Sequence, residues 1–408
     1  MLDVLKEAAL RTGFLNEFKT SGDRVVLDPL VPQRRQLLCL FGLGTNAGLK
    51  RVCSGQDGVS YAELLHVRRR FITKESLRSA VVTVTNAILT ARDRAIWGEG
   101  TSSCASDSKK FGAWDQNLMA EWHVRYGGRG VMIYWHVERR SACIHSQLKR
   151  CSSSEVAAMI EGVLRHCTDA EIQKQYVDSH GQSEVAFASC HLLGFDLAPR
   201  LKAIARQRLY VPDLDLKEGL TNLTPILTRA INWDIMEQQY DEMIKHASGL
   251  RCQTADPETI LRRFTTSNVQ HPTYAALAEL GKVIKTIFLC RYLAEEPFRR
   301  EINAGLNVVD NWNSANGFIF FGKGGEISSN RLQDQEMSVF ALHLLQNSLV
   351  YVNTLMLQQI LAEPAWRNRM TPEDWRALFP LVYPHVNPYG QFDLDLDDRI
   401  DFEQKLAA

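Results

Sequence analysis

The sequence lacks an excess of either charge, a cysteine framework and a long apolar run. Lysine plus arginine and aspartate plus glutamate both number 47, so the formal net charge is zero. A polycation that binds nucleic acid through bulk charge alone is therefore excluded, although a local basic groove is not. None of the nine cysteines forms a C-x-x-C pair, which favours reduced thiols in a cytoplasmic protein over disulfides or a zinc site. The opening MLDVLKEAAL is no signal peptide, and without a run of about 18 apolar residues we expect no membrane span.

The residues that are present describe a globular protein, with 45% hydrophobic and 23% charged residues over 408 positions. That length is sufficient for two or three packed units. Residues 1–97 contain segments such as DVLKEAALRTGFLNEF, whose apolar spacing near 3.6 predicts a helical N-terminal region. The glycines of FGLGTNAGLKR lack the G-K-[ST] ending of a phosphate loop, so we interpret this stretch as a turn between helices.

The pattern changes after residue 98. GVMIYWHV and ACIHSQL, separated by ERRS, predict a β-hairpin, on which His136 and Glu138 are interpreted as sheet-surface residues. Ser152 to Glu155 has the pattern of a capping box before the helix in VAAMIEGVLRHC. A strand that ends at Asp178, a helix in SEVAFASCHLLG and a short strand in QRLYVPD follow.

Strand signals are missing from 213–300. Thr224-Pro225 and Asp256-Pro257 each place a cap residue before a proline, and both pairs therefore predict helix starts. Another long helical pattern runs through MSVFALHLLQNSLVYVNTLMLQQIL, and the acidic tail QFDLDLDDRIDF is expected to be solvated.

This order of elements fits an α/β fold with a mixed sheet and helices on its faces. It matches a ribonuclease-H-like core that a large helical insertion interrupts, preceded by the α-helical N-terminal region. We divide the chain into the helical N-terminal region (1–97), the first part of the core (98–212), the helical insertion (213–300), the second part of the core (301–360) and a C-terminal tail (361–408).

Two aspartates stand where such a sheet would bring metal ligands together. Asp107 is expected to follow the first strand of the core, and Asp178 the strand after the first core helix. Two divalent ions about 3.5–4 Å apart stabilise both the attacking and the leaving oxygen of phosphoryl transfer. Magnesium prefers hard oxygen ligands, so a few carboxylates suffice to hold it. The alternatives are a turn aspartate at 178 and a solvated loop acid at 107.

Several ordered motifs resemble the catalytic region of the Tn3 family of replicative bacterial transposases. They are SDSKKFGAWDQ, GGRGVMIYWHVE, QLKRCSSSEVAAMIEGVLRH, YVDSHGQSE, SCHLLGFDLAPRLK and FIFFGKGGEI, and the similarity runs through nearly the whole chain. The resemblance implies an acidic Asp, Asp, Glu triad whose first two members fall on Asp107 and Asp178.

The third acid departs from the family pattern. Reading back from IFFGKGGEI, the stretch LNVVD takes the place of the family's LNKGE, so Asp310 stands where the family has glutamate. An alignment on INAGL would instead place Leu306 there, which cannot bind metal. Aspartate is one methylene shorter than glutamate, and a misplacement of about 1 Å can lower a rate on the order of 100-fold. Glu326 and Glu336 are the competing candidates for this role.

The resemblance also implies the chemistry and the partners. We expect metal-dependent DNA cleavage and strand transfer in replicative transposition, with Mg²⁺ (or Mn²⁺ as a substitute) bound by Asp107, Asp178 and Asp310. The expected partners are transposon ends and target DNA, bound by a homodimer on paired ends in the bacterial cytoplasm, at the nucleoid. His180 and Gln182 are possible supporting residues that orient water or contact a phosphate, with turn hydrogen bonding as the alternative.

Three further interpretations stay open. Family members are more than twice as long, so the chain is expected to be truncated at its N-terminus. It is then either an active catalytic region or a weak or inactive remnant that binds DNA or an intact transposase and regulates transposition; a generic ribonuclease-H-like nuclease is a third option. Finally, nine side chains are candidates for DNA contacts, with a solvated face as the alternative for the arginines and core packing for the tryptophans: Arg68, Arg69, Arg70, Arg139, Arg140, Trp114, Trp122, Trp135 and Trp312.

Overall fold

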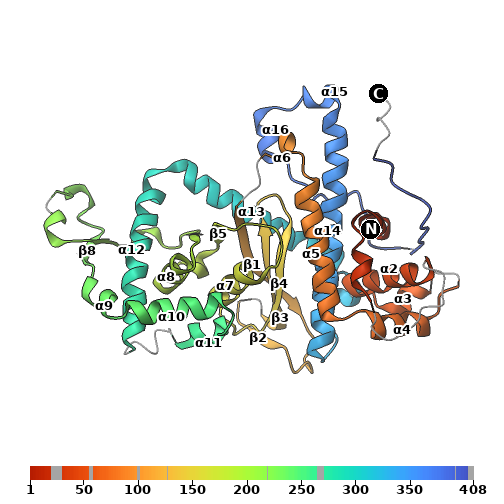
Figure 1. The fold of residues 1–408 in the computed structure, drawn as a ribbon, viewed down its shortest axis with the longest axis horizontal. Helices are drawn as coiled ribbons and strands as arrows, with labels where there is room; N and C mark the ends of the chain where they lie inside the picture. The colour runs from red at the N-terminus through yellow and green to blue at the C-terminus, as the bar shows by residue number, and fades with distance from the viewer. Residues whose placement is uncertain are drawn as a thin grey trace.

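The computed structural model describes residues 1–19, 30–54, 58–98, 102–125, 127–217, 219–263, 271–390 and 392–402. Helices open the chain, as the 3.6-residue spacing predicted (Figure 1). They are α1 Leu2–Thr12, η1 Phe14–Glu17, α2 Leu30–Gly44, α3 Leu49–Cys53, α4 Tyr61–Phe71, α5 Lys74–Ala91 and α6 Arg94–Trp97. Ser60 begins α4 with a complete capping box, and the glycine-containing segment after α2 is the expected turn between helices.

A mixed sheet follows, as predicted. Its strands are β1 Ser103–Gly112, β2 Glu121–His123, β3 Gly128–Glu138, β4 Cys143–Lys149, β5 Lys174–Val177 and β6 Asp196–Pro199. The order is β2-β3-β1-β5-β6, and β4 also pairs with β3. The pairs β1–β3 and β3–β4 are antiparallel, which confirms the hairpin, whereas β1–β5 and β5–β6 are parallel.

Helices cover both faces of this sheet. They are α7 Glu155–Arg165, α13 Glu296–Ile319 and α14 Leu332–Ala362. His136 of β3 points toward α7, where its Nε2 lies 3.0 Å from the carbonyl oxygen of Met159. Trp135, the preceding residue, packs against Trp312 of α13 and His343 of α14. Because neighbouring side chains of a strand point to opposite faces, α7 lies on one face and α13 and α14 on the other.

Burial on both faces corrects one expectation. His136 and Glu138 are not sheet-surface residues, because both are fully buried. Glu138 accepts from the guanidinium of Arg92 at 2.9 Å. Gly162 leaves room for the buried imidazole, since a Cβ at this position would lie 2.0 Å from the His136 ring.

The described part of the segment between β6 and α13 is mostly helical and contains two short strands, of which β7 is the strand predicted in QRLYVPD and β8 was not expected. Its elements are η3 Ile204–Arg206, β7 Leu209–Val211, η4 Leu214–Lys217, η5 Thr221–Leu223, β8 Leu227–Ala230, α9 Trp233–Gln238, α10 Tyr240–Arg251, α11 Pro257–Arg263 and α12 Pro272–Ala294. Pro257 begins a helix as predicted, but no helix follows Thr224-Pro225. The chain there enters β8, which pairs in parallel with β7 away from the main sheet, so the expectation of no strand after residue 213 is wrong.

The helix α12 packs along α8 Glu184–Leu193 and connects this segment to the sheet. Gly281 permits the close approach, because a Cβ there would lie 1.9 Å from the backbone oxygen of Glu184. Helix α12 then leads into α13, which contacts β1, β3 and β5 and returns the chain to the sheet.

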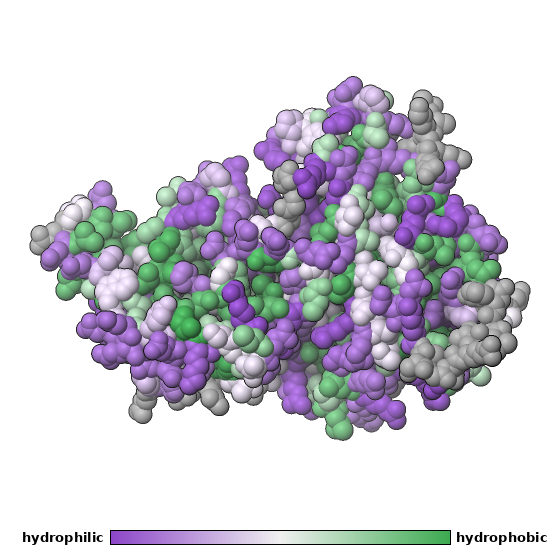
Figure 2. All heavy atoms as spheres, in the orientation of Figure 1, coloured by the Kyte–Doolittle hydropathy of each residue, from purple (hydrophilic) through white to green (hydrophobic). Residues whose placement is uncertain are grey.

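The long helix α14 connects the N-terminal helices to the sheet, because it contacts α1, α2, α5, α13 and β4 (Figure 1). By length and composition it could cross a membrane, but 89% of its most apolar window is buried inside the protein, as in the core helix of a soluble protein. On the face drawn in Figure 2, hydrophilic and hydrophobic residues are interspersed. The elements α15 Pro364–Arg367 and α16 Pro372–Ala377 follow.

The acidic tail is not solvated throughout, contrary to expectation. Phe392 and Leu394 are buried in the main core. The buried Lys6 of α1 donates to the backbone oxygen of Asp395 at 2.9 Å, and Glu7 accepts from the backbone nitrogen of Ile400 at 3.0 Å. The tail is therefore fastened to the first helix.

Candidate active site

The sheet register brings the first two predicted acids together. In the parallel ladder between β1 and β5, Ser106 pairs with Val177. One residue further, Asp107 and Asp178 stand side by side at the carboxyl end of β5. Asp178 follows its strand as predicted. Asp107 does not follow the first strand; it lies inside β1, because this strand continues to Gly112 in its pairing with β3.

Asp178 begins a 3₁₀ turn, η2 Ser179–Gly181. Its Oδ1 accepts from the backbone nitrogen of His180 at 2.8 Å, and its Oδ2 lies 2.7 Å from Nδ1 of the same residue. Asp178 therefore fits both interpretations of this residue. One of its carboxylate oxygens caps the turn, and the other contacts the imidazole of His180.

The third predicted acid, Asp310, lies on α13 close to the other two. One helical turn further, the amide of Asn313 donates to Asp107 Oδ2 at 3.1 Å, and the ammonium of Lys109 donates to the Asn313 backbone oxygen. Burial and the charge of Asp178 raise the pKa of Asp310, against the opposing effect of Arg200. The structure therefore brings the three acids close enough for their charges to act on one another, although Asp310 does not line the cavity that Asp107 and Asp178 line.

The pKa of Asp107 lies well above the usual range of an aspartate. Burial raises its pKa to about 7, against the effect of a hydrogen bond from the Ser108 backbone. The carboxylates around it act in the same direction as burial, in the order Asp178, Glu155 and Asp310. Like charges that repel one another in a half-buried site are stabilised by a cation. The donor set consists of carboxylate oxygens, the ligands that Mg²⁺ prefers, so the residues present fit a divalent metal ion.

The two supporting candidates have different surroundings. His180 belongs to the site: its Nδ1 lies 2.7 Å from Asp178 Oδ2 and 3.0 Å from Glu155 Oε2. Gln182 does not, because its side-chain oxygen accepts from the backbone nitrogen of Lys202 at 3.3 Å. This bond joins Gln182 to a segment 20 residues further along the chain, so it is neither a contact with the site nor the turn hydrogen bond expected as the alternative.

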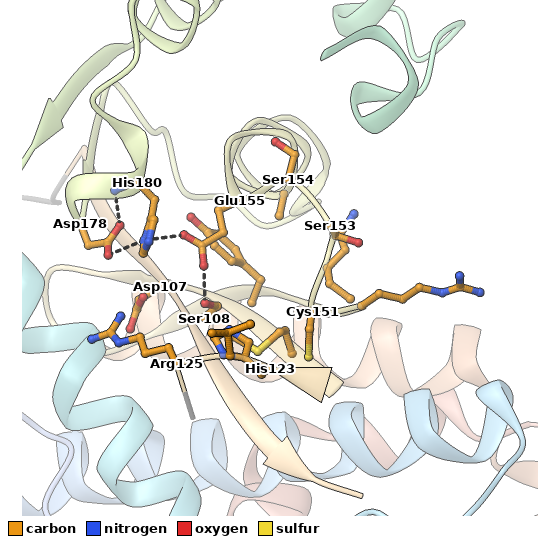
Figure 3. Close-up of a pocket in the computed structure, with 16 residues that line it drawn as sticks. Asp107, Ser108, His123, Arg125, Cys151, Ser153, Ser154, Glu155, Asp178 and His180 are labelled. Atoms are coloured by element: carbon orange, nitrogen blue, oxygen red, sulfur yellow. Dashed lines mark hydrogen bonds and ion pairs between the residues drawn. The ribbon is translucent and has the colours of Figure 1, made fainter. Parts of the chain in front are cut away.

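Sequence reasoning missed Glu155, which lies beside Asp107 and Asp178 (Figure 3). The helix cap is Ser154, whose hydroxyl accepts from the backbone nitrogen of Ala157 at 3.3 Å, so the predicted box from Ser152 to Glu155 is wrong. Glu155 is the first helical residue, and its Oε1 accepts from the hydroxyl of Ser108 at 2.7 Å. Three consecutive serines made the cap ambiguous in the sequence.

These side chains line a cavity of about 470 Å³ on the α7 side of the sheet. Basic side chains border it as well: Arg125, Lys149 and Arg150. The cavity combines a carboxylate cluster with cationic groups, which is the combination that a phosphodiester and its metal ions require.

The competing third acids lie elsewhere. Glu336 forms an ion pair with Lys74 at 2.7 Å. The side chain of Glu326 lies against Gly112 at the far end of β1, where a Cβ on the glycine would lie 3.2 Å from its Cγ. Neither glutamate lines the cavity.

The candidate DNA contacts differ in their exposure and in their partners. Trp135 and Trp312 are buried in the core, whereas Trp114 and Trp122 are exposed. Arg68 pairs with Asp334, which gives it a structural role. Arg139 and Arg140 line a separate groove with residues of α6, α13 and α16.

Comparison with known proteins gives one consistent result. Residues 3–392 match the family described as the Tn3 transposase DDE domain. The chain is 26% identical over 397 residues to the transposase for transposon Tn1546 of Enterococcus faecium, covering 96% of this chain and 39% of that protein. It is 28% identical over 362 residues to the transposase for transposon Tn501 of Pseudomonas aeruginosa, covering 87% of this chain and 36% of that protein. The chain thus spans less than two fifths of the length of these curated relatives.

Proposed function

Because the chain belongs to the Tn3 transposase DDE domain family, we propose that it is a transposase catalytic region that cuts DNA strands and transfers them during replicative transposition. The observation that carries the proposal is the parallel register of β1 and β5, which sets Asp107 beside Asp178. The charges of these acids and of Asp310 act on one another, as expected for a ligand set that shares metal ions.

The sheet supports a ribonuclease-H-like core as the finer description of the fold. Three strands, β4, β3 and β1, pair in antiparallel fashion, and β5 and β6 extend the sheet in parallel to β1. Helices cover both faces, and the mostly helical segment 200–295 separates β6 from α13, on which the third acid lies.

Asp107, Asp178 and Asp310 would hold Mg²⁺, with Mn²⁺ as a substitute. The bound metal would activate the attacking oxygen and stabilise the leaving oxygen of the phosphodiester. The chain's own contribution is position: β1 and β5 fix two carboxylates, and Asn313 ties α13 to Asp107 at 3.1 Å. The basic residues that border the cavity, such as Arg150, would bind phosphates of the DNA.

The substrates of this reaction would be transposon ends and target DNA, bound by a homodimer in the bacterial cytoplasm at the nucleoid. After cleavage, the freed 3′-hydroxyl would attack a target phosphodiester in line, forming a new bond to phosphorus while the target's 3′-oxygen leaves as a hydroxyl, without a covalent enzyme intermediate. The alternative of an inactive regulatory remnant is not favoured, because the curated relatives are transposases and the acids remain grouped.

The test is nicking and strand joining on DNA that carries transposon ends, with Mg²⁺ or Mn²⁺ present. We expect Asp178→Ala to abolish both activities, because the central carboxylate is lost. We expect Asp310→Glu to raise them, because the longer side chain restores the family's reach. Asp234→Ala, which removes an exposed acid of α9, is the matched control and should leave activity unchanged. Metal-dependent activity that survives Asp178→Ala would refute the proposal.

A further inference from the structure

Glu155 is tied to both strands that supply the predicted metal ligands. Its Oε1 accepts from the hydroxyl of Ser108, the residue after Asp107, at 2.7 Å. Its Oε2 lies 3.0 Å from Nδ1 of His180, which in turn contacts Asp178 at 2.7 Å. The N-terminus of α7 is thereby directed at the carboxyl end of β5, and α7 also contacts the 3₁₀ turn η2 (Figure 3).

The arrangement is compact enough for one cation. Ligand atoms of Glu155, Asp178 and His180 all lie within 4.8 Å of one another. Carboxylate oxygens that bind the same ion at 2.0–2.6 Å lie within about 5 Å of each other, so this spacing is that of a shared ion. The effect of Glu155 on Asp107 agrees with this placement, since its charge acts on that carboxyl more strongly than the charge of Asp310 does.

A helix-capping role alone does not explain Glu155. Acidic residues are favoured in the first turn of any helix, and Glu184 offers a direct comparison. It is likewise the first residue of its helix, α8, and follows a serine cap, Ser183, that accepts from a backbone nitrogen. Its carboxylate lies 4.0 Å from the ammonium of Lys285 and does not line the acidic cavity.

We propose that Glu155 is a fourth acid of the active site and a direct ligand of its divalent metal ion, together with Asp178 and Asp107. The inference deepens the proposed function and rests on it, because it takes a divalent cation to be the group that these acids hold. The proposal thus gives the site one glutamate ligand, on α7, although its acid on α13, Asp310, is an aspartate. His180 competes with the cation for the same carboxylate oxygens.

The test measures Mn²⁺ binding to the purified full chain by isothermal titration calorimetry and by electron paramagnetic resonance of free Mn²⁺. Glu155→Gln should weaken binding about tenfold or more, because a charged ligand is lost. Glu184→Gln, the matched control, removes the same charge from the same helical position and should leave the affinity within about twofold. Circular dichroism and thermal melting report on folding, and Glu155→Asp, which keeps the charge but shortens the reach, serves if the glutamine variant does not fold.

Two further variants separate the possible failures. If wild type binds Mn²⁺ and Asp178→Asn weakens binding but neither Glu155 variant does, the role of Glu155 is overturned and the proposed function stands. If wild type does not bind Mn²⁺, the proposed function fails together with this inference. His180→Ala should preserve or strengthen binding; a loss equal to that of Glu155→Gln, with no further loss in the double variant, would show that Glu155 acts only through the imidazole and would overturn the proposal.

Discussion

Replacing Asp107 by asparagine is expected to stabilise the metal-free protein at pH 8. The charge of this half-buried carboxyl is opposed by burial and by the neighbouring acids Asp178, Glu155 and Asp310. Asparagine removes the charge and keeps a side-chain oxygen that can accept from Asn313, which now donates to Asp107 at 3.1 Å. The variant therefore isolates the electrostatic free energy from the hydrogen bond.

The magnitude follows from the pKa, which rises from an ordinary 3.8 to about 7 in the folded protein. Between these values the folded state binds more protons than the unfolded state, so stability falls as the pH rises through this window. At about 1.4 kcal/mol per pKa unit, this carboxyl lowers the free energy of unfolding by up to about 4 kcal/mol at pH 8, where the folded state holds it ionised, and by about 2 kcal/mol at pH 5, where folding requires it to take up a proton. Relaxation of the site reduces both figures, so we expect a gain for Asp107→Asn of about 2–4 kcal/mol at pH 8 and about half as much at pH 5.

The assay is urea denaturation in EDTA, followed by circular dichroism at pH 5 and at pH 8. Asp234→Asn, an exposed acid far from the cavity, controls for the loss of one charge. Addition of Mg²⁺ should stabilise wild type and should do so much less for the variant. A variant that is no more stable than wild type at pH 8, or whose gain is the same at both pH values, would refute the electrostatic account of the cluster.

Three other substitutions test the packing that holds the site. Gly281→Ala should lower the free energy of unfolding, measured in urea, by about 1–3 kcal/mol, because its Cβ would lie 1.9 Å from a backbone oxygen of α8. Gly249→Ala on α10 is the control: its Cβ would meet only ordinary contacts, so this change should be neutral or stabilising. Asn347→Ala should cost about 1–3 kcal/mol, since its buried amide donates to the Cys143 carbonyl at 2.8 Å and accepts from the nitrogen of the same residue at 3.0 Å; thermal melting measures the loss. Leu394→Ala removes a buried anchor of the C-terminal tail and should make that tail more accessible to limited trypsin digestion, followed by mass spectrometry.

Local patterns predicted the elements whose signals are contained within a few residues. The hairpin, the strand that ends before Asp178 and the helix that begins at Pro257 all depend on short-range alternation or capping, and all three occur. Thr224-Pro225 carries the same signal as Asp256-Pro257 but leads into β8. The difference is tertiary, because β8 gains its hydrogen bonds from pairing with β7, which no local signal specifies.

Burial on both faces of the sheet was also beyond local inference. Polar residues at alternate positions of a strand ordinarily predict a solvated face. The polar pair on β3 is instead buried, with His136 beneath α7 and Glu138 beside Arg92. The burial depends on helices from other parts of the chain, which the local pattern of the strand does not show. Glu155 was missed for a related reason: its role depends on which residues the N-terminus of α7 approaches in the fold, and local sequence does not give that packing.

The position of the third acid is set by how α13 packs on the sheet, and this bears on the aspartate at 310. Gly305 lets the helix lie directly on β5, since a Cβ there would be 2.4 Å from the ring of Tyr176. Trp312 packs against Trp135 of β3, and Asn313 reaches Asp107. A helix held this close to the sheet shortens the distance that Asp310 has to cover, which offsets part of the missing methylene, and Asp310→Glu tests how much of it remains. The missing methylene and the close approach of α13 therefore have to be considered together. Gly305→Ala should move α13 away from β5 and weaken Mn²⁺ binding through Asp310, even though no ligand is changed. Adding Asp310→Glu, with its longer side chain, should recover part of that loss.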